Sequence, residues 1–282
     1  MKILIVGGHS ALAQMLSPVL ASLGEVLTAG RSGCDVTLEL STSSDRFCLP
    51  QDIDVVVNTA AHFGGADFNA LLEAEHINAL GGLKLCHAAS ESGIRHFVNI
   101  SSINAYLESD SAYYSAYSLS KRHADELIQL YCARAGLPCA ILRPSQLYGE
   151  PDSFRRNQPF LYGTLDKALR NEDIVIYGNR DAQRNYLHAQ DLCRIISCVI
   201  SSRVEGLYAC TTSQDSSLLA VSNTIVKTAG SASKVVFNRA MNDIADNVFP
   251  YDDTLYRSIG TYPEIDLNDG IGRLVASRLM TS

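Results

Sequence analysis

The amino-acid sequence predicts an α/β fold with a doubly wound parallel sheet, followed by a smaller α/β lobe. Two observations predict this class. Short apolar runs alternate with longer stretches in which apolar residues recur every three or four positions, and this alternation is typical of βαβ units. The 282 residues, of which 46% are hydrophobic and 19% charged, are enough for one large domain or for a main domain with a smaller partner.

Five apolar runs in the first half of the chain are expected to form the parallel strands. Parallel strands are buried on both faces by their crossover helices, so they are continuously apolar. The first helix is expected to follow a glycine turn and to extend through Leu23, with further helical patterns over residues 71–85 and 124–131. Such crossovers are right-handed and place a ligand at the carboxyl ends of the strands. The expected strands cover residues 3–6, 26–28, 55–57, 97–100 and 139–142.

After Gly149 the sequence changes character, with Pro151, Pro159, polar loops and shorter elements. Residues 1–149 are therefore expected to form the large domain. Residues 150–282 are expected to form the smaller lobe, with parts of residues 178–212 woven back into the large domain. The expected strands here cover residues 174–177 and 206–209, and the expected helices cover residues 189–200, 218–229 and 269–279.

Charge and cysteine usage exclude several classes of function. A formal net charge of −7 and the lack of a basic run argue against nucleic acid and anionic membranes as partners. No apolar run reaches the roughly 18 residues that cross a bilayer, and the short apolar start has no signal-peptide pattern. We therefore expect a cytoplasmic protein. The eight cysteines follow neither Cys-x-x-Cys nor zinc-site spacing, which predicts reduced thiols in the core and no metal site.

A glycine turn joins the first expected strand to the first expected helix. It keeps the spacing of a G-x-x-G-x-x-G motif, with Ser10 and Ala13 in place of two glycines. In a Rossmann sheet this turn holds a dinucleotide, since glycine lets the pyrophosphate approach the backbone and the helix start offers N–H groups. A turn that needs glycine only for its geometry would have the same pattern. The residues expected to bind the cofactor here are Gly7, Ser10, Ala11 and Leu12.

The end of the second expected strand favours NADP over NAD. Folds that bind NAD usually carry an acidic residue there for the ribose hydroxyls, whereas this chain has Arg31 and Ser32. These two side chains can hold a 2′-phosphate through charge-assisted hydrogen bonds, which a carboxylate would repel. A solvated loop arginine is the alternative. Asp35 is expected near the adenine, and the small residues Ala60 and Ala61 are expected to leave room for the cofactor.

Ser102, Tyr117 and Lys121 carry the groups for proton transfer. Tyr117 and Lys121 are four residues apart in an expected helix, so their side chains lie on one face. A phenol with a pKa of about 10 is a poor acid or base at neutral pH, but an adjacent ammonium stabilises the phenolate and lowers that pKa. Ser102 can donate a hydrogen bond to a carbonyl oxygen on which charge develops. A Tyr-x-x-x-Lys pair is common by chance, but its place in the βαβ series favours catalysis.

With these motifs the sequence resembles the extended short-chain dehydrogenase/reductase family, the group of nucleotide-sugar epimerases, dehydratases and ketoreductases. The resemblance runs nearly from end to end. It departs from the family pattern in the glycine turn, in a short segment between Ser102 and Tyr117, and at Ser118, where glycine or alanine is commoner. The matching segments are the glycine turn, residues 58–61, Asn78 with Gly81 and Leu83, residues 101–106, Tyr117 with Lys121, residues 142–144, residues 147–149, residues 184–188 with Asp191 and Leu192, residues 253–260 and residues 269–270.

The resemblance assigns roles to these positions. It implies that Ser102, Tyr117 and Lys121 are the catalytic triad and that Asn78, Tyr117 and Lys121 also bind the cofactor. It implies that residues 1–149 form a dinucleotide-binding domain and residues 150–282 a substrate-binding lobe. Family members often dimerise through helices near residues 67–89 and 112–135. Because helices that cover a sheet need apolar faces in any case, the sequence leaves a homodimer undecided.

The resemblance also implies a nucleotide-sugar substrate. Arg184 is expected to meet its diphosphate, because arginine pairs well with phosphate oxygens. Arg155 and Arg156 are equally well explained as surface residues. The implied substrate-binding residues are His62, Ser102, Asn104, Gln146 and Arg184.

Within this family the sequence favours a reductase. Dehydratases usually carry acidic groups beside the catalytic serine, whereas here Ile103 and Asn104 follow Ser102. Arg31 favours NADP, which suits net reduction. The expected activity is therefore the NADPH-dependent reduction of a nucleotide-activated 4-keto-6-deoxy sugar, in surface polysaccharide or deoxysugar biosynthesis. The sequence resembles the family's dTDP-4-dehydrorhamnose reductases and GDP-fucose synthases more than its NAD-bound epimerases. An NAD-dependent epimerase and a non-catalytic NADP-binding sensor or scaffold are the alternatives.

Overall fold

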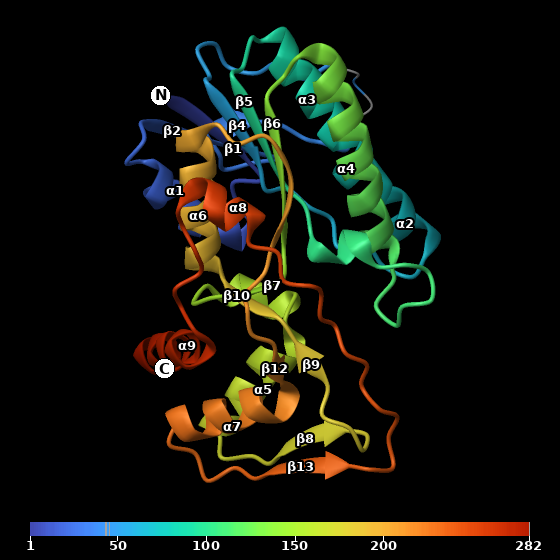
Figure 1. The fold of residues 1–282 in the computed structure, drawn as a ribbon, viewed down its shortest axis with the longest axis vertical. Helices are drawn as coiled ribbons and strands as arrows, with labels where there is room; N and C mark the ends of the chain where they lie inside the picture. Colours follow the sequence, from blue (N-terminus) through green and yellow to red (C-terminus); the bar gives the residue numbers. More distant parts are fainter. Residues whose placement is uncertain (43, 45, 282) are drawn as a thin grey trace. The chain divides into compact units, whose positions relative to one another are not determined.

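Figure 1 shows the computed structural model of the chain, which describes residues 1–42, 44 and 46–281. The chain divides into two compact units. The first comprises Met1–Pro144, Cys193–Cys210 and Asp253–Tyr262, and the second comprises Ser145–Leu192, Thr211–Asp252 and Pro263–Ser282. Each unit therefore draws on three separate stretches of the chain.

The first unit is built on a seven-stranded sheet with the order β11-β6-β5-β4-β1-β2-β3. All neighbouring strands are parallel. The order runs outward from β1 in both directions, and helices lie on both sides of the sheet, α3 and α4 on one side and α1 and α6 on the other (Figure 1). The predicted doubly wound α/β class is therefore confirmed. The strands are β1 Lys2–Val6, β2 Glu25–Gly30, β3 Val36–Thr37, β4 Val55–Asn58, β5 His96–Ile100, β6 Cys139–Pro144 and β11 Gly206–Cys210.

Three consecutive helical segments connect β4 to β5. The α-helices α2 and α3 are joined by η1, a π-helical turn, with no break between them. A π turn inserts one extra residue into a helix and is often found at functional sites. The helical segments of this unit are α1 Ala11–Leu20, α2 Phe68–Ala74, η1 Glu75–Leu80, α3 Gly81–Glu91, the 3₁₀ turn η2 Ile103–Tyr106, α4 Ala116–Ala135, most of α6 Ala189–Ser202, and α8 Thr254–Ile259.

The core of this unit lies between the sheet and its helices. Strands β4 and β5 are buried along their whole length, and six of their nine residues are apolar, as expected of strands covered on both faces. Leu85 and Cys86 of α3 and Ile128 of α4 pack with Phe97 of β5 in one apolar cluster. All eight cysteines of the chain are free thiols.

The first helix ends earlier than predicted. α1 covers Ala11–Leu20, whereas the apolar pattern extends to Leu23. Gly24 has a φ of +153°, and a Cβ at this position would collide with the carbonyl group of Met1. The chain must therefore leave the helix before Gly24 in order to pass beside β1 and enter β2. Residues 21–23 form a turn instead.

The second unit contains three two-stranded sheets and a set of helices. Helix α7 packs against both α5 and α9. The paired strands are β7 Gln146–Tyr148 with β10 Tyr186–His188, β9 Gln183–Arg184 with β12 Ser216–Ser217, and β8 Ile174–Tyr177 with β13 Val235–Asn238. The helices are the 3₁₀ turn η3 Asp152–Arg156, α5 Pro159–Leu169, α7 Leu218–Thr228 and α9 Leu267–Thr281.

Two features are absent from the described ranges. None of the helices there is long and apolar enough to cross a membrane. Across the same ranges, His, Cys, Asp and Glu side chains form no group of three or more that could hold a metal ion.

Candidate active site

The glycine turn after β1 is held tightly against the loop after β4. Gly7 has a φ of +86°, and a Cβ there would lie 2.7 Å from the backbone nitrogen of Ala60. Glycine is therefore required both by conformation and by space. The amides of Gly7 and Gly8 donate to the carbonyl of Ala29, at 2.9 and 3.0 Å, which fixes the turn to β2.

Ser10 caps helix α1. Its Oγ accepts a hydrogen bond from Ala13 N at 3.0 Å and lies 3.0 Å from the hydroxyl of Thr59. The amides of Ala11 and Leu12 stand in the first turn, where a helix has no internal acceptors for its N–H groups. A serine thus serves as the cap at a position where the family commonly has glycine, and the helix start still offers donors to an anion.

The loop after β2 carries the residues predicted to distinguish NADP from NAD. Arg31 and Ser32 are exposed, and Arg31 makes no hydrogen bond or ion pair with any residue that the structure describes. Asp35 Oδ2 accepts from both the amide and the hydroxyl of Thr28 at 2.8 Å. These hydrogen bonds lower the pKa of Asp35, and the bond from the Thr28 amide has the largest effect. The carboxylate is thereby fixed to β2, while the predicted contact of Asp35 with adenine stays a prediction.

His9 was missed by the sequence analysis, although it lies inside the glycine turn. Its Nε2 is hydrogen-bonded to the carbonyl oxygen of Ser32 and lies 3.6 Å from the thiol of Cys34. His9 therefore joins the glycine turn to the loop that carries Arg31. No short-range pattern points to this contact, because 23 residues separate the two partners.

Asn78 connects the loop after β4 to helix α4. It lies in the π turn η1, and its Oδ1 accepts from His62 N at 2.8 Å. Its Nδ2 donates to His62 O at 2.8 Å and to Ser120 Oγ at 2.9 Å. The amide group of Asn78 thus positions the backbone of this loop beside the helix of Tyr117. Its predicted contact with the cofactor is not tested by these bonds.

Helix α4 begins with a capping box that accounts for the unusual serine at position 118. Ser118 N donates to Ser115 Oγ at 3.4 Å, and Ser115 N donates to Ser118 Oγ at 2.8 Å. The two reciprocal bonds satisfy amides that the helix itself leaves unpaired. They fix the first turn of α4, and Tyr117 lies in that turn.

The structure brings Ser102, Tyr117 and Lys121 together. Ser102 follows β5 and begins η2, and its side chain is hydrogen-bonded to that of Tyr117. Lys121 Nζ lies 5.9 Å from the ring centroid of Tyr117 and donates to Ile100 O at 2.8 Å. One side chain from the segment after β5 and two from α4 thus form one cluster at the carboxyl end of the sheet, where doubly wound folds bind ligands.

Burial sets the protonation of this cluster. Burial raises the pKa of Tyr117 to about 12, against the lowering expected from the neighbouring ammonium, and the hydrogen bond with Ser102 opposes that rise. Burial lowers the pKa of Lys121 to about 8, and the negative charge of Asp125 opposes that fall. At neutral pH the phenol therefore holds its proton and the ammonium its charge. Asp125 was not singled out from the sequence.

Phe63 is a second residue of the site that the sequence analysis missed. Its ring stacks on the ring of Tyr117 with centroids 5.0 Å apart and planes at 25°. Gly64 makes this approach feasible, because a Cβ there would lie only 3.0 Å from Tyr117 N. Phe63 is 43% exposed, so it covers one face of the phenol and still presents its own ring to solvent. An aromatic residue in a loop gives no signal of a partner so far along the chain.

The predicted substrate-binding residues fall in both units. In the first unit, His62 Nε2 lies 3.2 Å from Glu73 Oε2, and half-buried Asn104 lies in η2. In the second unit, half-buried Gln146 opens β7. Arg184 Nη1 donates at 2.8 Å to the carbonyls of Gln183 and Ala245. Arg184 therefore supports its own lobe, and its role toward a phosphate stays a prediction.

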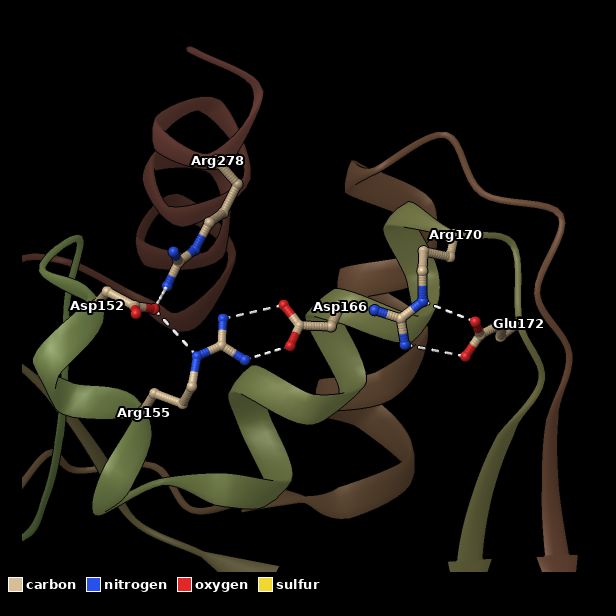
Figure 2. Close-up of polar contacts among 6 residues, drawn as sticks. All are labelled: Asp152, Arg155, Asp166, Arg170, Glu172 and Arg278. Atoms are coloured by element: carbon tan, nitrogen blue, oxygen red, sulfur yellow. Dashed lines mark hydrogen bonds and ion pairs between the residues drawn. The ribbon is translucent and has the colours of Figure 1, made fainter. Parts of the chain in front are cut away.

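Arg155 is occupied by contacts within the second unit. Figure 2 shows its guanidinium between Asp152 and Asp166, with Arg278 of α9 contacting the same oxygen of Asp152. Its Nε lies 3.0 Å from Asp152 Oδ1, and its Nη2 lies 3.0 Å from Asp166 Oδ1. The arginine thus joins η3 to α5. These ion pairs explain the position of Arg155 without a substrate contact.

With the glycine turn, the Ser-Tyr-Lys cluster and the parallel sheet in place, the comparisons with known proteins define the class. Residues 3–208 match the model of the NAD dependent epimerase/dehydratase family, and the chain belongs to this family. The family is dependent on a nicotinamide dinucleotide.

The names of the similar proteins refer to different nucleotide sugars. A putative UDP-glucose 4-epimerase of Methanocaldococcus jannaschii is 26% identical over 237 residues, covering 80% of this chain and 77% of that protein. The GDP-L-fucose synthase of Escherichia coli is 22% identical, covering 96% and 94%. A dTDP-4-dehydro-6-deoxy-D-allose reductase of a Streptomyces species is 29% identical, covering 52% and 50%.

The similar solved structures show the same fold. The UDP-N-acetylglucosamine 4-epimerase from Bacillus cereus aligns with a TM-score of 0.79 at 20% identity, covering 100% of this chain and 97% of that one. MoeE5, in complex with UDP-glucuronic acid and NAD, aligns with a TM-score of 0.82 at 20% identity, covering 100% of both chains.

Proposed function

We propose that the chain is an NADPH-dependent reductase of a nucleotide-activated 4-keto-6-deoxy sugar. The observation that carries this proposal is Arg31. It lies just beyond β2, exposed and without a partner among the described residues, next to the exposed Ser32. A guanidinium there attracts a 2′-phosphate. The nearby carboxylate of Asp35 is held by Thr28.

The glycine turn supports a dinucleotide at this edge of the sheet. The space that a Cβ would fill at Gly7 is only 2.7 Å from Ala60 N, and the start of α1 presents the amides of Ala11 and Leu12. The residues proposed to hold the cofactor are Gly7, Ser10, Ala11, Leu12, Arg31, Ser32, Asp35, Ala60, Ala61, Asn78, Tyr117 and Lys121.

The protonation of Tyr117 supports reduction. When bound, the reduced nicotinamide supplies a hydride to the carbonyl carbon of the sugar. Ser102 donates a hydrogen bond to the carbonyl oxygen, and Tyr117, whose raised pKa of about 12 keeps its proton in place, transfers that proton to the same oxygen. The carbonyl becomes an alcohol, and the ammonium of Lys121 stabilises the phenolate that remains.

Two other functions remain as alternatives, each with its own support. An NAD-dependent epimerase is supported by the similarity to the putative UDP-glucose 4-epimerase over 80% of this chain and by the structural likeness to MoeE5, which was solved in complex with NAD. It would hold NAD tightly through each turnover. A non-catalytic NADP sensor or scaffold would not need Ser102, Tyr117 and Lys121 to meet in one cluster, as they do here.

The test is turnover by the Tyr117→Phe variant. Purified protein is expected to oxidise NADPH in the presence of at least one of a panel of 4-keto-6-deoxy nucleotide sugars, measured as a fall in the absorbance of the reduced nicotinamide. Tyr117→Phe, which removes the proton donor and keeps the ring, is expected to lose about 100-fold or more. Equal activity on every substrate, with NADPH still bound, would favour the sensor. NAD that stays with the purified protein would favour the epimerase.

Arg31→Ala provides the matched control for the cofactor. This variant keeps the catalytic cluster but loses the guanidinium proposed to bind the 2′-phosphate. KM for NADPH should therefore rise, while KM for NADH should hardly change. If both constants stay unchanged, the assignment of the 2′-phosphate to Arg31 is wrong.

A further inference from the structure

Asp125 is a fully buried carboxylate one helical turn beyond Lys121. Its Oδ2 accepts from Ser101 Oγ at 2.7 Å and from Arg143 Nε at 2.8 Å. Its Oδ1 is buried as well, and accepts no hydrogen bond from any residue that the structure describes. Buried carboxylates are costly unless they are paired, so a half-satisfied one calls for a reason.

The two donors tie Asp125 to the segment that carries Ser102. Ser101 precedes Ser102 directly and also donates its amide to Leu142 O at 2.8 Å. Arg143 lies on β6, and its guanidinium stacks over the ring of Tyr106 at 4.2 Å, at the end of the turn η2 that Ser102 begins. Asp125 thus links α4 to the strands β5 and β6 on both sides of Ser102.

Asp125 is also the negative charge that acts on Lys121. The groups around the Lys121 ammonium are Ile100 O on β5, the phenol of Tyr117 on its own helix, and the Asp125 carboxylate. From β6, Arg143 faces Asp125. Asp125 raises the pKa of Lys121 against the effect of burial, and it also adds to the rise in the pKa of Tyr117. Both effects favour the protonated forms.

We propose that Asp125 is a positioning residue, which keeps Lys121 charged and Tyr117 protonated in the working pH range and fixes the segment that holds Ser102. The proposal rests on the reductase function given above. The costly burial of this carboxylate is then explained by what it does for the proton donor and its neighbour.

The sign of the expected effect follows from charge. Asp125→Asn keeps the shape of the side chain but removes its negative charge. The pKa values of Lys121 and Tyr117 should then both fall. The enzyme is active only while Lys121 is charged and Tyr117 is protonated. The alkaline limb of the pH profile of kcat/KM should therefore move to lower pH. A shift of one pH unit corresponds to about a tenfold loss of activity on the alkaline side.

Arg143→Lys is the matched control. It keeps the positive charge beside Asp125 but replaces the planar guanidinium, so it disturbs the same packing without changing the charge. A merely structural role for Asp125 predicts that both variants lower kcat/KM and leave the limb in place. The proposal predicts the largest shift of the limb for Asp125→Asn, a smaller shift for Asp125→Glu and none for Arg143→Lys.

The experiment is the pH profile of kcat/KM with NADPH for the wild type and the three variants, each checked for folding by circular dichroism. An alkaline limb that Asp125→Asn leaves within about 0.3 of a unit, a twofold change, would overturn the proposal. If Asp125→Asn does not fold, Asp125→Glu decides, because its displaced carboxylate must still move the limb.

A second measurement separates this proposal from the reductase itself. The Lys121 ammonium can be titrated by NMR of protein with ¹³C-labelled lysine side chains, the signal being assigned with Lys121→Arg. A lower pKa of Lys121 in Asp125→Asn supports the role of Asp125, even where the wild type reduces no sugar, and then only the reductase proposal fails. An unchanged pKa overturns the role of Asp125 whatever the reaction.

Discussion

Two sets of arginine–aspartate pairs, one in each unit, use the same chemistry in different surroundings. In the first unit, Arg143 and Asp125 have side chains that are 9% and 1% exposed. In the second unit, Arg155 meets Asp152 and Asp166 at the surface, where the three side chains are 36%, 63% and 29% exposed (Figure 2). Burial therefore decides what the same kind of ion pair contributes.

The difference is one of solvation. Taking two charges out of water costs several kcal/mol per ion, on the order of what their attraction returns, so a buried pair adds little net stability as a whole. Once it is in place, however, neither partner can be removed without leaving the other unsatisfied. At the surface water replaces a lost partner, and such pairs contribute little. The buried pair is thus suited to holding a site, and the surface cluster to joining helices.

The largest effect is expected from Asp125→Ala. Removing the carboxylate leaves Ser101 and Arg143 without their acceptor in the core. The free energy of unfolding, measured by urea denaturation, should fall by about 3–5 kcal/mol. A loss below about 1 kcal/mol, the range of surface pairs, would remove the distinction between the two regions.

A smaller effect is expected from Arg155→Ala. This arginine makes a two-pronged contact with Asp166 and a further one with Asp152, but solvent screens all three groups. The free energy of unfolding should fall by about 0.5–1 kcal/mol, and high salt should shrink the difference.

Arg170→Ala is its matched control, because Arg170 pairs with Glu172 in the same region but is more exposed than Arg155 (Figure 2). This variant should melt with the wild type. A loss as large as that of Arg155→Ala would mean that side-chain packing, rather than the ion pairs, accounts for both.

The smallest expected effect concerns how stability depends on pH, where the exposed Asp152 and the buried Asp125 should act in opposite directions. Arg278 and then Arg155 lower the pKa of Asp152, so this group stabilises the fold above the ordinary value of about 4 and loses that contribution as pH falls below it. Burial raises the pKa of Asp125 despite Arg143. Its contribution is therefore greatest below about pH 4 and declines as pH rises through the raised pKa.

Urea unfolding between about pH 3 and 6.5 can measure both trends. The stability of the wild type relative to Asp152→Asn should decrease as the solution is acidified. Its stability relative to Asp125→Asn should decrease as the solution is made less acidic. Two trends of the same sign would contradict the contrast between the exposed and the buried carboxylate.

The sequence was sufficient to predict six of the seven strands of the large sheet and most helices, because their signal is local, but the two-residue strand β3 was not predicted. Strands β4 and β5 are apolar at six of their nine buried positions, and the predicted run 174–177 coincides with β8. The predicted end of α1 was wrong because the helix is ended by a contact with another part of the chain. Gly24 must pass the backbone of Met1, and apolar periodicity carries no information on that contact.

The site was predictable where its residues share an element. Tyr117 and Lys121 are one helical turn apart, so a helix alone brings them together. Phe63 and Asp125 were not predictable in this way. The ring of Phe63 meets a helix that begins far along the chain, and Asp125 finds its partners just after β5 and on β6. A carboxylate in an otherwise charged helical stretch resembles a solvated residue until its burial is known.

The π turn η1 makes chain length matter in an element where it is usually unimportant. Asn78 lies within Glu75–Leu80 and reaches His62 and Ser120 from there. Each residue of a helix turns the next by about 100°, so deleting one residue before Asn78 would rotate its amide away from both partners. Most proteins absorb such length changes in surface loops. In this chain an inherited one-residue deletion in the helix between β4 and β5 would disconnect the loop of His62 from the helix of Tyr117, without replacing any residue of the site.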